Sequence, residues 1–315
     1  QKTAYEIRLS LVGSEMCIRD RITSRGGRFI GLIPSGMPDP RALVIRAAGT
    51  NCDAEMVRGF EMGGAAVSLV HVDRLIADPA LVGGFDLIGF PGGFSYGDDI
   101  ASGRILAMKL RARLYPALRE AARRGCPMIG VCNGFQAIVQ VGLLPGPASG
   151  SDWPEDRAPE QTVSLAHNAG GRFIDKWVRV EADAGSPCIW TRPWAEWAAE
   201  HPGEADDVLR LPIAHGEGRF VAASEEVVAG LRERGQIALR YAAGDNPNGS
   251  MGDVAGLCDA SGRIFGLMPH PDRYLGWTLH PFWTRLEAEV RDPRRPTPGA
   301  MMFRAAVEAA QATRV

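Results

Sequence analysis

The run Gly130-Val131-Cys132-Asn133-Gly134 places a thiol between two glycines. The apolar residues 127–129 come before it, and residues 135–141 follow with the spacing of a helix. A nucleophile at a tight strand-to-helix turn points out above the sheet, and glycines flank it because a Cβ there would clash. The start of the helix also favours a thiolate. We therefore predict that Cys132 is a catalytic nucleophile; the alternative is a buried structural cysteine at a strand end.

A histidine and a carboxylate stand close together near the other end of the chain, in Pro269-His270-Pro271-Asp272-Arg273. Pro271 favours an extended conformation at His270. Side chains two positions apart in an extended chain lie on the same side. We therefore expect the carboxylate of Asp272 to orient the imidazole of His270. A lone histidine is more often a structural residue, but this one follows a predicted strand and has a carboxylate beside it.

Two glycine-rich segments supply further candidates. Pro91-Gly92-Gly93 follows a predicted strand and leaves backbone N–H groups approachable. One of these N–H groups and that of Asn133 form a predicted oxyanion hole, with a plain glycine turn as the alternative. The segment lacks the G-x-x-x-x-G-K-S/T pattern of a phosphate-binding loop. The second segment, His-Gly-Glu-Gly at 215–218, follows a later predicted strand.

The elements that must position these residues alternate between strands and helices. Short connections between them predict a parallel sheet with helices on both faces and a site beyond the carboxyl ends of its strands. Strands are expected at 42–47, 66–72, 85–90, 127–129, 209–215 and 236–241, and hairpins at 162–181 and 254–268. Helices are expected at 53–62, 100–124, 135–141, 224–235, 281–290 and 299–315.

The composition is that of an ordinary globular chain of 315 residues. The net charge of −2 gives no electrostatic reason to expect a nucleic acid or a membrane surface as a partner. No apolar run approaches the ~20 residues of a membrane-spanning helix. The six cysteines are scattered without a C-x-x-C pair, which argues against a zinc ribbon or a disulfide framework. We expect no metal and a cytoplasmic location.

We expect one main domain with insertions. Residues 1–40 are interpreted as a leader, artefactual or disordered, and are left out of the fold. The domain spans 41–290, with insertions near 146–161 and 183–207, and 291–315 form a linker and a C-terminal helix. The second insertion carries three tryptophans that we expect to pack rather than to bind a ligand: Trp190, Trp194 and Trp197.

Taken together, these segments resemble class I glutamine amidotransferases, and among them the glutaminase subunits of phosphoribosylformylglycinamidine synthases in purine biosynthesis. The resemblance runs from Ala42 to about Arg285. It implies an α/β three-layer sandwich with a mostly parallel central sheet and an added antiparallel hairpin region. The segments that carry it are PGGFSYGDD (91–99), GVCNGFQ (130–136), NAGGRF (168–173), AHGEGRF (214–220), DNPNGS (245–250) and GLMPHPDR (266–273).

The resemblance also implies roles for single residues. Cys132 would attack the side-chain amide of glutamine, and His270 would relay protons. The third member of the family's triad is usually a glutamate, whereas this chain has the shorter Asp272. The oxyanion loop and elbow correspond to Gly92, Gly93 and Asn133. The positions that hold the glutamine correspond to Gln136, His215, Gly216, Glu217 and Gly218.

For the whole reaction, the resemblance implies no cofactor in this chain. It implies a large synthetase subunit that uses ATP and Mg²⁺ and consumes the ammonia while converting FGAR (the formylglycinamide ribonucleotide) to FGAM (the amidine). A small third subunit often joins them. Three other interpretations stay open: a thiol hydrolase of the α/β-hydrolase type, in which the carboxylate precedes the histidine; a non-catalytic scaffold that binds the synthetase; and an amidotransferase of another pathway.

Overall fold

The computed structural model describes residues 38–148, 150–155 and 157–314. Their strands are β1 (Arg41–Arg46), β2 (Ala66–His71), β3 (Leu87–Phe90), β4 (Met128–Val131), β5 (Val163–Ala166), β6 (Ile174–Ala182), β7 (Arg210–His215), β8 (Arg219–Ala222), β9 (Leu239–Tyr241), β10 (Val254–Cys258) and β11 (Ile264–Leu267). Their α-helices are α2 (Asp53–Gly63), α3 (Val72–Ala77), α4 (Arg104–Arg113), α5 (Tyr115–Arg123), α6 (Asn133–Val141), α7 (Arg192–Glu200), α8 (Ala205–Val208), α9 (Glu225–Glu233) and α10 (Pro298–Thr313).

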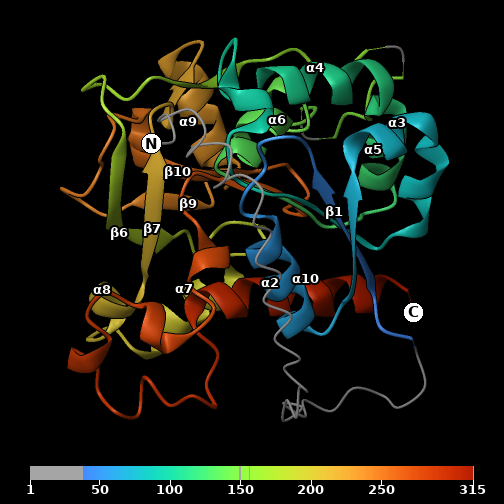
Figure 1. Ribbon diagram of the computed structural model, residues 1–315. Coiled ribbons are helices and arrows are strands. Elements are labelled where there is room, and N and C mark those ends of the chain that lie inside the picture. Colours follow the sequence, from blue (N-terminus) through green and yellow to red (C-terminus); the bar gives the residue numbers. More distant parts are fainter. Residues whose placement is uncertain (1–37, 149, 156, 315) are drawn as a thin grey trace, which may run out of the picture. The chain divides into compact units, whose positions relative to one another are not determined.

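A mixed nine-stranded sheet organises the described residues, in the order β2-β1-β3-β4-β11-β10-β9-β6-β7 (Figure 1). The first five strands pair in parallel. The other four pair antiparallel to their neighbours. The expected α/β fold is confirmed, with a parallel core extended by antiparallel strands; the predicted hairpin of β10 and β11 forms the junction between the two parts.

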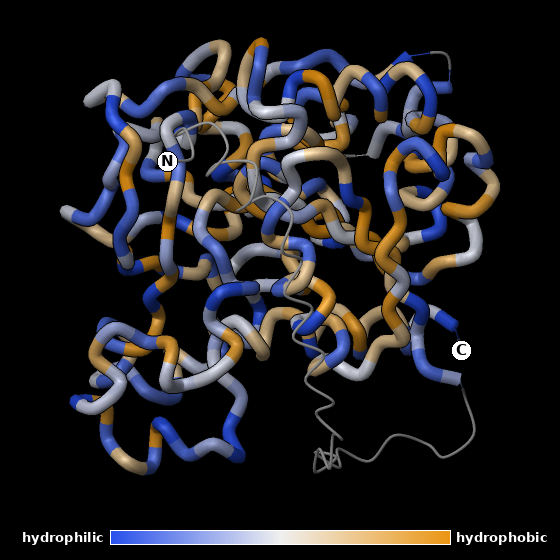
Figure 2. Tube along the Cα trace, in the orientation of Figure 1, coloured by the Kyte–Doolittle hydropathy of each residue, from blue (hydrophilic) through white to orange (hydrophobic). Residues whose placement is uncertain are grey.

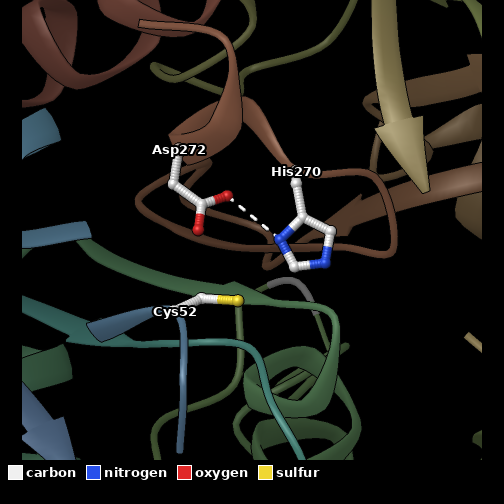
Figure 3. Close-up of side chains that lie close together, drawn as sticks. All are labelled: Cys52, His270 and Asp272. Atoms are coloured by element: carbon white, nitrogen blue, oxygen red, sulfur yellow. Dashed lines mark hydrogen bonds and ion pairs between the residues drawn. The ribbon is translucent and has the colours of Figure 1, made fainter. Parts of the chain in front are cut away.

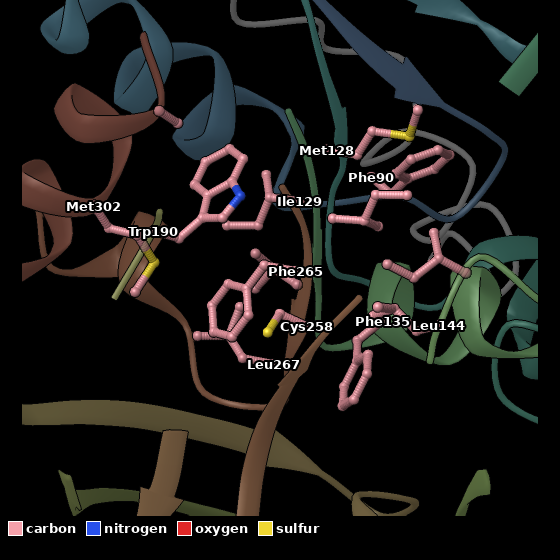
Figure 4. Close-up of a cluster of buried hydrophobic side chains, with 14 of the residues drawn as sticks. Phe90, Met128, Ile129, Phe135, Leu144, Trp190, Cys258, Phe265, Leu267 and Met302 are labelled. Carbon is pink, nitrogen blue, oxygen red and sulfur yellow. The ribbon is translucent and has the colours of Figure 1, made fainter. Parts of the chain in front are cut away.

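Helices cover the sheet on both faces. Helices α2, α7 and α10 pack together on one side, and α6 lies on β3, β4 and β11 on the other, with α4 against it. The central strands β3, β4 and β11 are buried along their whole length, as parallel strands between two helical layers must be. Their sequences, LIGF, MIGV and IFGL, contain only apolar residues and glycine. Figure 2 shows how apolar and polar residues alternate along the chain, and Figure 4 shows Trp190 and Phe135 on opposite sides of the central strands.

The tryptophans of the second insertion belong to this core, as predicted. Trp190 and Trp194 are fully buried, and Trp197 packs against the core. The indole N–H of Trp194 donates to the carbonyl of Pro298 at 2.7 Å, at the start of α10. The ring of Phe303 in α10 meets that of Phe60 in α2 edge-on, with centroids 5.1 Å apart. Aromatic packing therefore fixes α7 and α10 to the same face of the sheet.

The predicted helix at 100–124 is wrong, because two helices occupy this region. Helix α4 ends before Leu114, whose φ of −121° and ψ of −8° lie outside the helical region, and α5 begins at Tyr115. Pro116 explains the break, since proline lacks an N–H and its ring clashes with the carbonyl of the preceding turn. Both helices bury apolar residues on one side, so the amphipathic pattern of the sequence continues across the break.

Two other predicted elements are wrong as well. The runs around 162–181 do not form a hairpin: β5 pairs with β8, and β6 pairs with β7 and β9. Both strands pair with strands that are distant in sequence. The local alternation of polar and apolar residues does not show which distant strand is the partner. The expected helix at 281–290 is replaced by turns and one short 3₁₀ segment, Trp283–Arg285. There, burial of Leu286 and Val290 in a non-helical path overrides local helical spacing.

The predicted leader lies outside the described residues, apart from 38–40. The carbonyl of Pro40 accepts a hydrogen bond from the N–H of Ala66 at the start of β2 (2.8 Å). Within the insertion near 146–161, the described residues form neither a helix nor a strand, whereas the insertion near 183–207 contains α7 and α8. In the part of the chain that the structure describes, no helix is both long and apolar enough to span a membrane.

Candidate active site

Four neighbouring parallel strands deliver the candidate residues to one edge of the sheet. Cys52 follows β1, Gly92 follows β3, Cys132 follows β4 and His270 follows β11. Because carboxyl ends of parallel strands meet at one edge, these segments lie side by side although they are far apart in sequence.

Cys132 occupies the predicted elbow. Its φ of 50° and ψ of −108° are strained values for a residue with a Cβ, and its N–H donates to the carbonyl of Leu267 at 2.8 Å. A Cβ on Gly134 would overlap the carbonyl of Phe90, and one on Gly130 would lie 2.7 Å from Cδ1 of Ile138. The need for glycine on both sides of the thiol is thus confirmed.

His270 and Asp272 meet, with Nδ1 of the imidazole 3.2 Å from Oδ1 of the carboxylate (Figure 3). His270 is extended as expected, but Pro271–Arg273 form a 3₁₀ turn, so the expected extended path through Asp272 is wrong. Both are buried. The backbone N–H of His270 donates to the carbonyl of Pro212 in β7 (2.8 Å), which fixes the turn that carries the ring. The second carboxylate oxygen, Oδ2, is buried and has no partner among the described residues.

The pKa of His270 reflects two opposed effects. Burial by itself would lower the pKa of the imidazole, but the Asp272 carboxylate more than compensates, and hydrogen bonds with the thiols of Cys132 and Cys52 act in the same direction. The pKa of His270 is therefore raised well above its usual value. Such a ring is well placed to hold a proton while a thiolate forms next to it.

The predicted oxyanion donors border the same space. A Cβ on Gly92 would lie 2.7 Å from Cε1 of His270 and 3.4 Å from Cβ of Cys132. The carbonyl of Gly92 accepts from the N–H of Cys52, and the N–H of Phe94 donates to the carbonyl of Gly49. The N–H of Gly93, between these two contacts, has no acceptor among the described residues. Asn133 is the first residue of α6, so its N–H has no acceptor within the helix.

The side chain of Asn133 ties the oxyanion loop to α6. Its Oδ1 accepts from the N–H of Ser95 (3.2 Å), and its Nδ2 donates to Oδ1 of Asp98 (2.9 Å). Asp98 has a φ of 51° and also accepts from Ser102 and Gly103. Sequence reasoning gave Asp98 no role; its place in the PGGFSYGDD segment was the available signal.

The side chain of Asn168 holds the segment at 215–218 in place through hydrogen bonds. Its Oδ1 accepts from the N–H of Gly218 (3.1 Å) and lies 3.1 Å from Nδ1 of His215, and its Nδ2 donates to the carbonyl of His215 (2.8 Å). The carbonyl of Gly216 accepts from the backbone N–H of Asn168 (2.9 Å). Asn168 belongs to the NAGGRF segment singled out in the sequence, but the sequence did not show that this residue holds the 215–218 loop.

Two other predicted glutamine-binding residues, Gln136 in α6 and Glu217 in this loop, contact each other. The side-chain amide of Gln136 donates to the carbonyl of Glu217, and its oxygen accepts from Asn133 (3.2 Å). Glu217 accepts from the N–H of Ser102 through its carboxylate (3.2 Å). Gln136 therefore joins α6 to the 215–218 loop, and its direct contact with a substrate stays a prediction.

His215 is buried beside this loop. Burial lowers its pKa to about 4, and the charge of His270 acts in the same direction. His215 is therefore neutral at pH 7, and its Nε2 has no partner in the described structure.

Cys52 lies beside the His270–Asp272 pair, and no role was predicted for it from the sequence. Its N–H donates to the carbonyl of Gly92 (3.3 Å), and its thiol accepts a hydrogen bond from the guanidinium of Arg273 (3.0 Å). Its sulfur lies close to the His270–Asp272 pair (Figure 3). Its position after the first predicted parallel strand was the only signal available.

The chain is similar to glutamine-dependent enzymes over most of its length. Residues 39–308 match the CobB/CobQ-like glutamine amidotransferase domain. Phosphoribosylformylglycinamidine synthase subunit PurQ of Dehalococcoides mccartyi is 37% identical over 78% of this chain and 90% of its own length. The subunit of the same name from Cereibacter sphaeroides is 39% identical over 74% and 88%. The solved structure described as PurLQS from Thermotoga maritima superposes with a TM-score of 0.58 and 29% identity, over 86% of this chain and 99% of that one.

Proposed function

This chain belongs to the glutamine amidotransferases, in the family of the PurQ subunits of phosphoribosylformylglycinamidine synthase, and we propose that it hydrolyses L-glutamine to supply ammonia to that reaction. The observation that carries the proposal is the strained Cys132 at its elbow beside the buried His270–Asp272 pair. A thiol, a proton carrier and an orienting carboxylate are the parts that acyl transfer needs.

The proposed reaction begins with the thiolate of Cys132 attacking the carboxamide carbon of glutamine. The N–H groups of Gly93 and Asn133 stabilise the oxyanion, an effect of about 3–4 kcal/mol per donor in other enzymes. His270 gives a proton to the departing ammonia, which leaves a glutamyl thioester on Cys132. Water, deprotonated by His270, then attacks the thioester, and glutamate leaves.

We propose that the ammonia passes to a large synthetase subunit, which uses ATP and Mg²⁺ to convert FGAR to FGAM, with a small third subunit completing the complex. The similarity to the PurLQS structure supports this assignment. This chain itself would need no cofactor for the glutaminase step. Only 6% of Cys132 is exposed, and His270 is more deeply buried. We therefore expect the lone chain to be a weak glutaminase that its partner activates by opening the site.

The test is glutamate release from glutamine by the purified chain, with and without the synthetase subunit and its substrates. Partner-stimulated release that is lost in Cys132→Ala would support the proposal. The variant should still bind the synthetase, because the thiol lies inside the site.

The same experiment separates the alternatives. Ester hydrolysis without glutaminase activity would favour a thiol hydrolase. Binding of the synthetase without any glutamate release would favour a scaffold. If the wild-type chain neither reacts nor binds, the assignment to purine biosynthesis is wrong.

A further inference from the structure

We propose that Cys52, His270 and Asp272 form a binding site for Zn²⁺ and that a bound ion stops the glutaminase reaction. The three side chains are buried, and one ligand atom from each lies within 4.8 Å of the others. They come from two segments more than 200 residues apart, which the sheet brings to one edge (Figure 3). The three ligand atoms are therefore already close enough to surround one ion without a change in the backbone.

The donor set and its spacing suit zinc. Sulfur, imidazole nitrogen and carboxylate oxygen are its common ligands, with bonds of about 2.0–2.3 Å that put neighbouring donors of a tetrahedron about 3.3–3.7 Å apart. Nδ1 of His270 and Oδ1 of Asp272 are already 3.2 Å apart. The three ligand atoms lie within 4.8 Å of one another, so the sulfur has to approach by at most about 1 Å to reach the spacing of a zinc site. Mg²⁺ and Ca²⁺ prefer sites made of oxygen atoms and fit less well.

The contacts of Asp272 and Cys52 suit a bound cation. Oδ2 of Asp272 is buried without a partner among the described residues, so the carboxylate has a free lone pair to offer to an ion. The guanidinium of Arg273 donates a hydrogen bond to the sulfur of Cys52 (3.0 Å), which fixes the position of that sulfur. A hydrogen bond from Arg273 to the sulfur can persist when the sulfur is bound to the ion.

Binding would remove the proton carrier. Zinc takes the lone pair of Nδ1, so the imidazolium of His270 gives its Nδ1 proton to solvent and keeps the proton on Nε2. The thiol of Cys52 loses its proton to solvent as well. A ring whose Nε2 is protonated and whose Nδ1 is bound to a metal cannot accept a proton from Cys132. The ion therefore blocks thiolate formation without touching the nucleophile.

The test measures zinc binding rather than activity, so that its outcome is independent of the proposed function. The full chain carrying Cys132→Ala is titrated with ZnCl₂ in competition with a chromophoric chelator, because the catalytic thiol is then absent. We expect one tight site that weakens at least ~100-fold when Cys52→Ser is added, since a ligand is lost. The matched control adds Cys126→Ser, at a buried cysteine outside the cluster, and is expected to bind as before.

Cobalt gives a second measurement on the same variants. Co²⁺ bound through Cys52 should show a thiolate-to-metal absorption band, which Cys52→Ser removes and Cys126→Ser leaves in place. Equal zinc affinity in the Cys52→Ser and Cys126→Ser variants would overturn the proposal, as would a Co²⁺ complex that lacks the band. A Cys52→Ser variant that fails to fold is recognised by circular dichroism, and Cys52→Ala then replaces it.

Discussion

Gly92 and His270 touch across the active site: a Cβ on Gly92 would lie 2.7 Å from Cε1 of the imidazole. The oxyanion loop and the proton carrier are therefore fitted to one another with no space for a methyl group.

We predict that Gly92→Ala lowers kcat by about 100-fold, because displacement of a catalytic group by about 1 Å has an effect of that size. The fold should persist, since the clash involves one side chain. Steady-state kinetics of glutamate release with the synthetase present would measure it. Gly83→Ala is the control, because a Cβ at that position meets no atom within 4 Å. A Gly92→Ala enzyme with normal kcat would show that His270 has room to move.

The carboxylate of Asp272 is expected to matter through its charge. Asp272→Asn removes the charge that keeps the imidazole protonated and oriented, and we predict a loss of at least ~100-fold in kcat with little change in KM. Asp272→Glu restores the family's usual residue and should be as fast as wild type or faster. An Asp272→Asn enzyme of normal kcat would remove Asp272 from the mechanism.

The buried, neutral His215 predicts acid sensitivity of the fold. The unfolded histidine takes a proton below its ordinary pKa of 6.5, whereas the folded one does so only below about 4. Between these values the unfolded state binds more protons, so stability falls as pH falls, by up to about 3 kcal/mol in total. Urea unfolding at several pH values between 7 and 4 would measure it. His215→Asn should reduce the slope; an unchanged slope would assign it to other groups.

An exposed aromatic pair beside the site is expected to meet the synthetase. Phe94 follows the oxyanion loop and is 45% exposed, and Phe173 is 55% exposed, with ring centroids 6.4 Å apart. We predict that Phe94→Ser raises the synthetase concentration needed for half-maximal glutaminase activity about tenfold, equivalent to about 1.4 kcal/mol. Phe282→Ser is the control, at a 47% exposed ring outside the site loops. Equal effects of both changes would argue against a specific contact.

The parts of the site that follow from local rules were predictable from sequence. The elbow at Cys132 needs only a strand, a helix and two glycines, and the pairing of His270 with Asp272 needs only an extended dipeptide spacing. Both depend on residues that are neighbours in the chain. The meeting of His270 and Asp272 is nevertheless reached through a 3₁₀ turn at Pro271–Arg273, not through the extended chain that the pattern predicts.

The parts that depend on pairing between distant segments were not predictable. Asn168 acts on a loop about fifty residues later, and Cys52 reaches His270 only because β1, β3, β4 and β11 are neighbours in the sheet. Spacing rules for metal sites likewise look for ligands close in sequence, and so could not group Cys52 with Asp272. The false hairpin at 162–181 has the same origin, since β5 found its partner in β8.

Strand β7 connects two parts of the site that have different tasks. Through the carbonyl of Pro212 it holds the backbone of His270, and three residues later it ends at His215, where the 215–218 loop begins. One edge strand therefore supports both the proton carrier and the loop proposed to hold glutamine. A contact made by a partner on this strand would reach proton transfer and substrate binding at the same time.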